Sequence, residues 1–420
     1  MTPTTHPIPS LVSRLGGATR RTLARLRPGT AGERTPGTRA GSAPRRRPPR
    51  GRASRGVSEV IGFILIFGVI ILGMTLVQLY GVPATNERLE FEHSQRALGD
   101  VAELSDLFSQ AIATGQQGSV TIEAGMNYPS RLFLFNPAPV SGSIRLDNAG
   151  QVTVSNALGT GDVADYWNGT PQSFDTAGVA YRAEYNIYEG APTRHVENGL
   201  VYDRFPNGEF LPRNRAPLID GRSITLVTLT GDVSTSSSGS VVFEAAPVSV
   251  AGAPITVRNV SAVQNVTLSV PTGLSAAEMR EVLATELYPN GHVLSVTDGG
   301  GTLVDIELTA GTYDLRTTQL QVGTSEAPDV DAHYVVSVTD APFAVGEGSS
   351  SVVVVEVRDS FNNPVSGVTV EATTVPGIGS IAPLNDTTDQ DGRVRLVYSA
   401  PADISATTQR ADEVRFTIGE

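Results

Sequence analysis

The amino-acid sequence predicts a mainly β protein, in which a single N-terminal transmembrane helix continues into an amphipathic helix, a β-rich region and a C-terminal β-sandwich. Three observations predict this fold class. Residues 60–82 carry no charged side chain, the region after residue 115 is a succession of short β patterns, and the last part of the chain has the turn pattern of a compact sandwich. A chain of 420 residues is long enough for two or three domains.

The composition excludes several kinds of chemistry. Cysteine is absent, which excludes disulfide scaffolds, cysteine nucleophiles, thiolate zinc sites and iron–sulfur clusters. Lysine is absent as well, so that all 31 basic residues are arginine. This excludes Gly-Lys-Ser/Thr phosphate loops, Schiff-base lysines and the Ser-x-x-Lys acyl-transfer motif.

Charge is divided unevenly along the chain. Residues 1–56 hold 13 Arg and a single acidic residue, Glu33, whereas the rest holds 18 Arg and 42 acidic residues. The Arg- and Pro-rich segment 1–56 is predicted to be a disordered, cytoplasmic leader whose charge sets topology. The alternatives are attraction to nucleic-acid or lipid phosphates and a start site assigned too far upstream. The acidic, lysine-free remainder resembles proteins of salt-loving archaea, although a high-GC genome would also favour Arg.

Residues 57–82 are predicted to form the transmembrane helix. The uncharged stretch 60–82 corresponds to roughly 35 Å of helix, enough to cross the hydrocarbon core of a bilayer. A buried core helix is the alternative, but such a helix would not need to be apolar on every face. Because the basic leader precedes the helix, the N-terminus is expected in the cytoplasm and everything beyond Pro83 outside the cell.

The junction before the apolar stretch has an unusual order, Arg55-Gly56-Val57-Ser58-Glu59. An ordinary secretory signal places its small-residue cleavage site after the apolar segment. The junction resembles the class III signal peptide of archaeal type IV pilin-like proteins. The resemblance implies that a prepilin peptidase cuts between Gly56 and Val57 and leaves Glu59 near the new terminus. The long leader departs from the family pattern, and without cleavage the segment is a signal anchor.

Residues 83–115 are predicted to be an amphipathic helix, with Pro83 interrupting or kinking the helical path. Apolar residues recur at steps of three and four between acidic ones, which predicts a face that packs on the next domain or on a partner helix. His93 lies among acidic residues, with no second ligand nearby, and is expected at the surface without a function. The apolar positions are Leu98, Val101, Leu104, Phe108 and Ile112.

Residues 116–325 are predicted to form a β-rich ectodomain. Apolar and polar residues alternate over 179–187 and over 304–308, the period of half-buried strands, while 223–230 and 240–250 alternate less cleanly. The tyrosines of the first stretch are expected to pack across strands, with a sugar-binding platform as the alternative. One short helix is predicted to begin at Ser275, with Glu278 completing a capping box.

Three segments carry a further resemblance. Residues 86–95 (NERLEFEHSQ), 127–133 (NYPSRLF) and 311–316 (GTYDLR), together with the anchor, resemble an uncharacterised haloarchaeal family of membrane-anchored surface proteins. The resemblance covers most of residues 56–325. That family has no assigned activity, so the resemblance implies a location and no chemistry.

Residues 333–420 have a different sequence pattern from the preceding region, which predicts a separate module. A strand over 352–358, an Asn-Pro turn, a second strand and an Asp-Gly turn before a third predict a compact β-sandwich. This region is similar to bacterial Ig-like domains of the invasin and intimin type, which implies a rigid stalk or an adhesion module. Asp389 and Asp391 are expected to form a turn, with calcium binding as the alternative.

No catalytic, cofactor-binding or metal-binding residue is predicted. The five His form no ligand spacing, no Ser occupies a Gly-x-Ser-x-Gly elbow, and the two loose Gly-x-Gly-x-x-Ala stretches, 159–164 and 377–382, are expected to be turns. Four Asn-x-Ser/Thr sequons are predicted glycosylation sites in the ectodomain: Asn168, Asn259, Asn265 and Asn385.

We therefore expect a membrane-anchored cell-surface protein with a structural or adhesive role and no enzymatic one. The expected partners are the lipid bilayer, a prepilin peptidase and a surface-layer or adhesive partner, and no nucleic acid. One alternative is a type IV pilin-like filament subunit, in which Glu59 and the apolar helix pack subunits together. Another is an ectoenzyme or solute-binding receptor that uses a pocket in the β-rich region.

Overall fold

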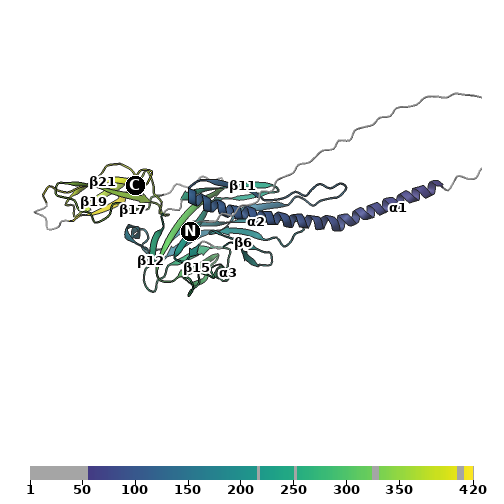
Figure 1. Ribbon diagram of the computed structural model, residues 1–420, viewed down its shortest axis with the longest axis horizontal. Helices are drawn as coiled ribbons and strands as arrows, with labels where there is room; N and C mark the ends of the chain where they lie inside the picture. The colour runs from purple at the N-terminus through teal and green to yellow at the C-terminus, as the bar shows by residue number, and fades with distance from the viewer. Residues whose placement is uncertain (1–54, 215–217, 250–252, 324–330, 404–410, 420) are drawn as a thin grey trace, which may run out of the picture. The chain divides into compact units, whose positions relative to one another are not determined.

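The computed structural model of the chain describes residues 55–214, 218–249, 253–323, 331–403 and 411–419 (Figure 1). The predicted leader therefore lies, up to residue 54, outside the described residues. The chain divides into two units, Met1–Leu65 and Ile66–Glu420, with the boundary inside the first helix. As the sequence predicted, the described residues are mainly β with one long apolar helix near the N-terminus.

The helical part continues past Pro83. Helix α1 (Arg55–Leu76) leads through a π-helical segment, η1 (Val77–Gly81), into helix α2 (Val82–Thr114). The predicted irregularity near Pro83 takes the form of this π-helical segment, and the helical path continues beyond the proline. Pro83 lies in the first turn of α2, directly after a wide turn in which the Val82 N–H donates to the Val77 carbonyl five residues back. A proline lacks an N–H and crowds the preceding turn, and a π turn is one way for a helix to accommodate it.

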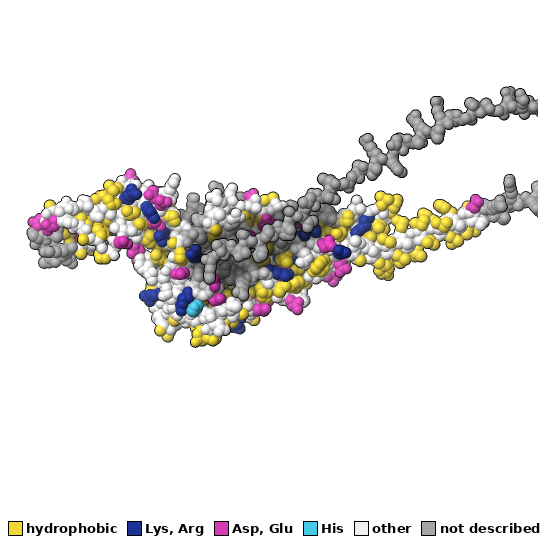
Figure 2. Space-filling view, in the orientation of Figure 1, with side chains coloured by type: hydrophobic (Ala, Val, Ile, Leu, Met, Phe, Trp, Pro, Cys, Tyr) yellow, Lys and Arg dark blue, Asp and Glu magenta, His cyan; other side chains and the backbone are white. Residues whose placement is uncertain are grey.

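Helix α1 exposes apolar side chains all round. Phe63, Leu65, Ile66 and Val69 are each at least 60% exposed, and Figure 2 shows hydrophobic side chains along almost the whole helix. Among the described residues, the continuous helical stretch Ser58–Thr114 is the one long and apolar enough to cross a membrane, and its apolar window has no buried residue. A helix that is hydrophobic on every face and contacts little protein could be a membrane anchor.

Two curled sheets form the β-rich body. In the first, β16 pairs in parallel with β9 on one side and antiparallel with β11 and β12 on the other, and β1 extends the sheet beyond β11. Its strands are β1 (Gly118–Glu123), β3 (Ala157–Gly159), β8 (Ile219–Asp220), β9 (Ser223–Asp232), β11 (Ser240–Ser249), β12 (Ile255–Asn259) and β16 (Thr312–Gly323).

In the second sheet, the long strands β2 and β4 pair along most of their length, with a bulge between Asp147 and Gly150. The order of the main path is β14-β15-β13-β2-β4-β5-β6-β7, and β10 also pairs with β2. Its strands are β2 (Ser141–Ser155), β4 (Gln172–Glu184), β5 (Thr193–Glu197), β6 (Leu200–Arg204), β7 (Phe210–Pro212), β10 (Ser234–Ser237), β13 (Thr267–Pro271), β14 (Val293–Gly300) and β15 (Leu303–Leu308).

Two apolar cores hold the body together. One lies between the sheets around Trp167, Leu226 and Ile306, and the short helix α3 (Ala276–Val282) adds Met279 to it. The predicted capping box at the start of α3 is confirmed: Ser275 and Glu278 bond each other's backbone N–H reciprocally. The other core is closed by α2, whose buried side chains pack on β1, β11 and β16.

The amphipathic pattern of α2 is confirmed, but the buried face is rotated slightly about the helix axis from the predicted one. Val101, Leu104 and Phe108 are buried as predicted, whereas Leu98 and Ile112 are half-buried. The remaining buried apolar positions of this stretch are Ala97, Leu107 and Ala111. The face that packs on the body is thus centred one residue away from the predicted stripe.

The last part of the described chain forms two small sheets around a third core. A four-stranded sheet has the order β17-β18-β21-β20, and β19 pairs with β22 in a second sheet. Val353, Val355 and Leu396 lie at the centre of the core. The strands are β17 (Tyr334–Ser337), β18 (Ser350–Arg358), β19 (Val370–Val375), β20 (Ser380–Pro383), β21 (Arg393–Ser399) and β22 (Glu413–Ile418).

Candidate functional site

One face of α2, close to its N-terminal end, buries polar side chains. Asn86, Glu90, His93 and Ser94 recur at helical spacing, and all four are fully buried. Burying a polar or charged group is costly unless hydrogen bonds compensate for the lost water. We call these four residues the polar face of α2, and the partners of each one define what it does.

The Glu90 carboxylate binds the turn that follows β4. Its Oε2 accepts from the backbone N–H of Ile187 at 2.9 Å and of Tyr188 at 2.6 Å, and its Oε1 accepts from the N–H of Asn186 at 3.2 Å. The Tyr128 hydroxyl also donates to Oε1. Burial, and then the hydrogen bond to Glu90, raise the pKa of Tyr128, so this hydroxyl stays protonated and remains a donor. The carboxylate thereby joins two loops to one helix.

His93 is buried, and the prediction that it lies at the surface is wrong. Its Nδ1 is 2.7 Å from the Tyr185 hydroxyl, and the two rings meet edge to face. Burial, and then the charge of Arg96, lower the pKa of His93 below its usual value. The imidazole is therefore neutral at pH 7. The prediction failed because the acidic neighbours in sequence point to other faces of the helix or are themselves buried.

A buried ion pair adjoins Ser94. Arg194 donates through Nη2 to the Ser94 carbonyl at 2.7 Å and to its hydroxyl at 3.1 Å. The Arg194 Nε is 3.6 Å from the Asp203 Oδ1, and both residues are at most 2% exposed. Arg213 donates from Nε to the other oxygen of Asp203 at 2.9 Å. The Asp203 carboxylate thus lies between the guanidinium groups of Arg194 and Arg213.

The first two segments of the haloarchaeal resemblance meet at the polar face. Arg131, from 127–133, donates to the Asn86 Oδ1 at 2.8 Å, and Tyr128 from the same segment binds Glu90. The third segment, 311–316, lies at the start of β16 instead. These contacts clamp the loop over residues 127–139 onto α2, just after the apolar stretch. The spacing of Asn86, Glu90, His93 and Ser94 along a helix is the signal that could have indicated this face.

A second buried polar cluster lies on β5 and β6. The Glu197 carboxylate accepts from the Thr272 hydroxyl at 2.8 Å and the Gly273 N–H at 3.1 Å, and the His195 ring stacks on Tyr202 at 4.8 Å. Burial lowers the pKa of His195, against the opposing charge of Glu197. In the part of the chain that the structure describes, no group of three or more His, Asp or Glu is arranged to hold a metal ion.

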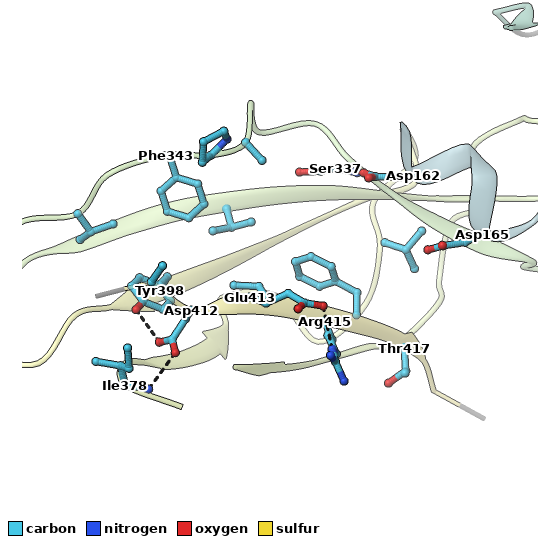
Figure 3. Close-up of a pocket in the computed structure, with 18 of the residues that line it drawn as sticks. Asp162, Asp165, Ser337, Phe343, Ile378, Tyr398, Asp412, Glu413, Arg415 and Thr417 are labelled. Carbon is cyan, nitrogen blue, oxygen red and sulfur yellow. Dashed lines mark hydrogen bonds and ion pairs between the residues drawn. The ribbon is translucent and has the colours of Figure 1, made fainter. Parts of the chain in front are cut away.

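A cavity of about 1390 Å³ opens beside the C-terminal sheets (Figure 3). It is lined by β22, by β17 and by the short helix η2 (Gly161–Asp165). The Tyr398 hydroxyl points at the Asp412 carboxylate and donates to it at 2.7 Å. Burial favours a higher pKa for Asp412, but hydrogen bonds, first those from the N–H groups of Gly379 and Ile378, outweigh it and lower the pKa. The carboxylate is ionised and engaged at the cavity wall.

The predicted processing residues lie at the start of α1. Arg55, Gly56 and Val57 are helical, and Glu59 is exposed in the next turn. The peptide bond between Gly56 and Val57 is thus in the first turn of the helix.

The four sequons differ in accessibility. Asn168 and Asn385 are exposed. Asn259 is half-buried and donates through Nδ2 to the Ser261 carbonyl, and Asn265 is half-buried and donates to Glu307. In the folded protein the first pair is therefore better placed to receive a glycan than the second.

Two alternatives from the sequence find no support in the geometry. Tyr181 is buried and its hydroxyl donates to the Ala124 carbonyl, so it is a packing residue and no sugar platform. The Asp389 carboxylate accepts from the N–H groups of Asp391 and Arg393, as expected of a turn.

The comparison with protein families finds similarity in the N-terminal part of the chain. Residues 55–126 match the model of DUF7289, a family of unknown function. An uncharacterized protein of Archaeoglobus fulgidus is 30% identical over 149 residues, which cover 35% of this chain and 25% of that protein. The chain thus matches a quarter of the length of this relative. No solved structure matches significantly. The matched stretch 55–126 includes α1 and the whole polar face of α2, and the archaeal relative fits the expected archaeal resemblance.

Proposed function

We propose that this protein is a single-pass cell-surface protein, with its N-terminus in the cytoplasm and its C-terminus outside, that has a structural or adhesive role. The observation that carries the proposal is the continuous helical path from the exposed apolar α1 into α2, which is embedded in the β-rich body. In this arrangement the proposed anchor leads directly, along a helical path, into a buried element of the body. Such a connection suits a protein that holds a surface structure at the membrane.

The acidic body and the terminal module support an outward role. Beyond residue 56 the chain carries 18 Arg and 42 acidic residues, a charge that keeps an exposed surface soluble. The two small sheets over residues 334–418 are what an Ig-like stalk or adhesion module would use, in keeping with the resemblance to invasin and intimin domains. The partner we propose for this module is a surface-layer component or an adhesive ligand.

Processing by a prepilin peptidase is part of the proposal. Mass spectrometry of membrane fractions, taken from cells shaved with protease, tests both the processing and the location. We expect mature peptides that begin at Val57 and loss of peptides from beyond residue 83 after shaving. An intact leader would overturn the processing step, and a protected C-terminal region would overturn the surface location.

A pilin-like filament subunit is the second candidate. The specific observation in its favour is that the helical path runs from α1 through η1 into α2 and that α1 exposes apolar side chains on all sides. The same surface that fits lipid would fit neighbouring helices in a filament core. Electron microscopy of cells that express the tagged protein distinguishes the candidates: labelled filaments support the subunit, and label confined to the cell envelope supports the anchor.

The third candidate, a solute-binding receptor or ectoenzyme, rests on the cavity lined by Tyr398 and Asp412. A thermal-shift screen with sugars, amino acids and nucleotides tests it. Stabilisation of the native protein that is lost in Asp412→Asn would favour this candidate over a purely structural role.

A further inference from the structure

The loop over residues 127–139 presents a cluster of large apolar side chains. The loop contains the uninterrupted run Leu132-Phe133-Leu134-Phe135, and the side chains of Leu132, Phe133 and Phe135 are 82%, 77% and 81% exposed. Single exposed apolar residues are ordinary on soluble proteins, whereas a cluster of three large ones marks an interaction surface. No ionisable residue follows Arg131 until Arg145. The tip of the loop is therefore both apolar and uncharged.

The tip is tied to the end of the apolar helical stretch. The Gln78 side chain, in η1, donates through Nε2 to the Phe135 carbonyl at 2.9 Å and accepts through Oε1 from the Phe135 N–H at 2.9 Å. Gln78 lies four residues before the end of the uncharged segment 60–82, beside the exposed side chains of Leu79 and Tyr80. The exposed residues of the loop therefore lie beside the last turn of the apolar helix, at the same height along the helix axis.

The reciprocal pairing fits a lipid surface. An amide side chain that faces the hydrocarbon core from the interface needs a partner for both its donor and its acceptor, because water is scarce in that core. The backbone of Phe135 supplies both. A loop inside the hydrocarbon core would leave other backbone groups unsatisfied, so the matching depth is the interface, where Tyr80 also belongs.

The base of the loop is fixed, so that its tip is presented in a defined position. Arg131 binds Asn86, Tyr128 binds Glu90, and the Asn136 Nδ2 donates to the Pro129 carbonyl at 2.7 Å. Phe133 adopts φ 60°, a left-handed conformation that is costly for a residue with a large side chain. The fold thus holds Phe133 outward in a conformation that an unconstrained loop would rarely adopt.

We propose that Leu132, Phe133 and Phe135 insert into the outer interface of the same bilayer that α1 crosses and form a second membrane contact. This inference rests on the proposed function, because it requires α1 to be the anchor. The occupant is lipid, since the patch is continuous with the apolar helix and lacks charge. Two membrane contacts, one from the helix and one from the loop, would fix the rotation of the body about the anchor.

The absence of cysteine makes a direct test available. Single-cysteine variants of the full-length protein, Leu132→Cys and Phe133→Cys, are labelled with an environment-sensitive fluorophore. Each is reconstituted into two sets of liposomes, one with lipids spin-labelled near the headgroup and one with lipids spin-labelled deep in the acyl chain. Leu72→Cys, in α1, reports on the anchor. Val263→Cys, which replaces a side chain 87% exposed on the body, is the matched control for an exposed position away from the loop.

We expect at least a twofold greater quenching at positions 132 and 133 than at 263, together with strong quenching at 72 by lipids labelled deep in the acyl chain. Quenching at 72 but not at 132 or 133 would overturn the second contact and leave the anchor intact. Quenching at none of the positions would overturn the anchor and the inference with it. Energy transfer between labelled copies at position 133, without quenching by lipid, would assign the patch to a second copy of the chain and overturn the lipid assignment.

Discussion

The two halves of α2 are buried by different means. From Ala97 to Ala111 the helix buries apolar side chains against β1, β11 and β16, while from Asn86 to Ser94 it buries polar ones against loops and against Arg194 of β5. Apolar burial needs only shape and area. Polar burial needs a partner for each atom, and Glu90 alone uses three backbone N–H groups and a tyrosine hydroxyl. The difference shows how one helix can pack on a body at one end and position loops at the other.

The largest effect is expected from breaking the ion pair below the polar half. Asp203→Ala leaves the buried Arg194 without its carboxylate, which should cost about 3–5 kcal/mol of the free energy of unfolding. Urea unfolding of the detergent-solubilised full-length protein, followed by the fluorescence of its single tryptophan, the buried Trp167, measures the change. Asp106→Ala, at an exposed position of α2, should be close to neutral. Equal effects of the two changes would contradict the pairing.

The apolar half is tested by Leu104→Ala. Truncating this fully buried side chain removes apolar contacts and leaves a cavity, so we expect a loss of about 3 kcal/mol in the same measurement. Gln110→Ala, at an exposed position of the same helix, serves as the control. A loss under about 1 kcal/mol at Leu104 would mean that α2 is not packed on the body as described.

A smaller effect is expected from Glu90→Gln, which keeps the shape of the side chain and removes its charge. The hydrogen bonds to Ile187 and Tyr188 lose their ionised acceptor, which should cost about 1–3 kcal/mol. Hydrogen exchange should then accelerate at the amides of residues 186–188 while it stays unchanged in β16. The exposed Glu87→Gln is the matched control. Unchanged exchange at 186–188 would show that Glu90 does not hold this turn.

The smallest effect is a pH dependence of the polar half. Burial lowers the pKa of His93 in the folded state, whereas the unfolded chain keeps a value near about 6.5. As the pH falls below that value, the unfolded state binds the proton first and stability declines, by up to about 1.4 kcal/mol per pH unit, until the folded-state pKa is passed. Above the unfolded-state pKa the contribution is fully present. His93→Gln should lose less stability than the wild type between pH 7.5 and 5.5, and parallel pH curves would contradict a buried neutral imidazole.

The apolar half of this comparison was predicted from the sequence and the polar half was not. The three- and four-residue steps of Val101, Leu104 and Phe108 predicted a buried face, because apolar periodicity is a direct consequence of helix geometry. His93 was expected at the surface because its neighbours in sequence are acidic, and the burial of Glu90 was not predicted. Their burial depends on Tyr128, Tyr185 and the turn after β4, partners that only the tertiary fold brings together.

Elsewhere, interactions between residues close in sequence were predicted correctly, whereas contacts between distant segments were not predicted. The capping box of α3 and the turn at Asp389 involve residues within four positions of each other, so the sequence contained the whole interaction. The parallel pairing of β9 with β16 and the contact between Gln78 and Phe135 join distant segments. At Pro83 an interruption or a kink was expected, and the structure has a π turn directly before the proline, a form that was not expected from the sequence.

The pairing order of the first sheet also has a consequence for how the chain folds. Gly118 of β1 pairs with Ala245 of β11, and Ser223 of β9 pairs with Asp314 of β16, so the sheet on which α2 packs needs residues close to position 320 before it can close. Contacts between such distant segments form slowly, because a long loop must close first. A ribosome that has synthesised α2 must therefore add some 200 further residues before the apolar side of that helix has its full complement of partners. Until then the apolar face of the amphipathic α2 lacks some of its partners, so the packing of this helix on the body is a late step.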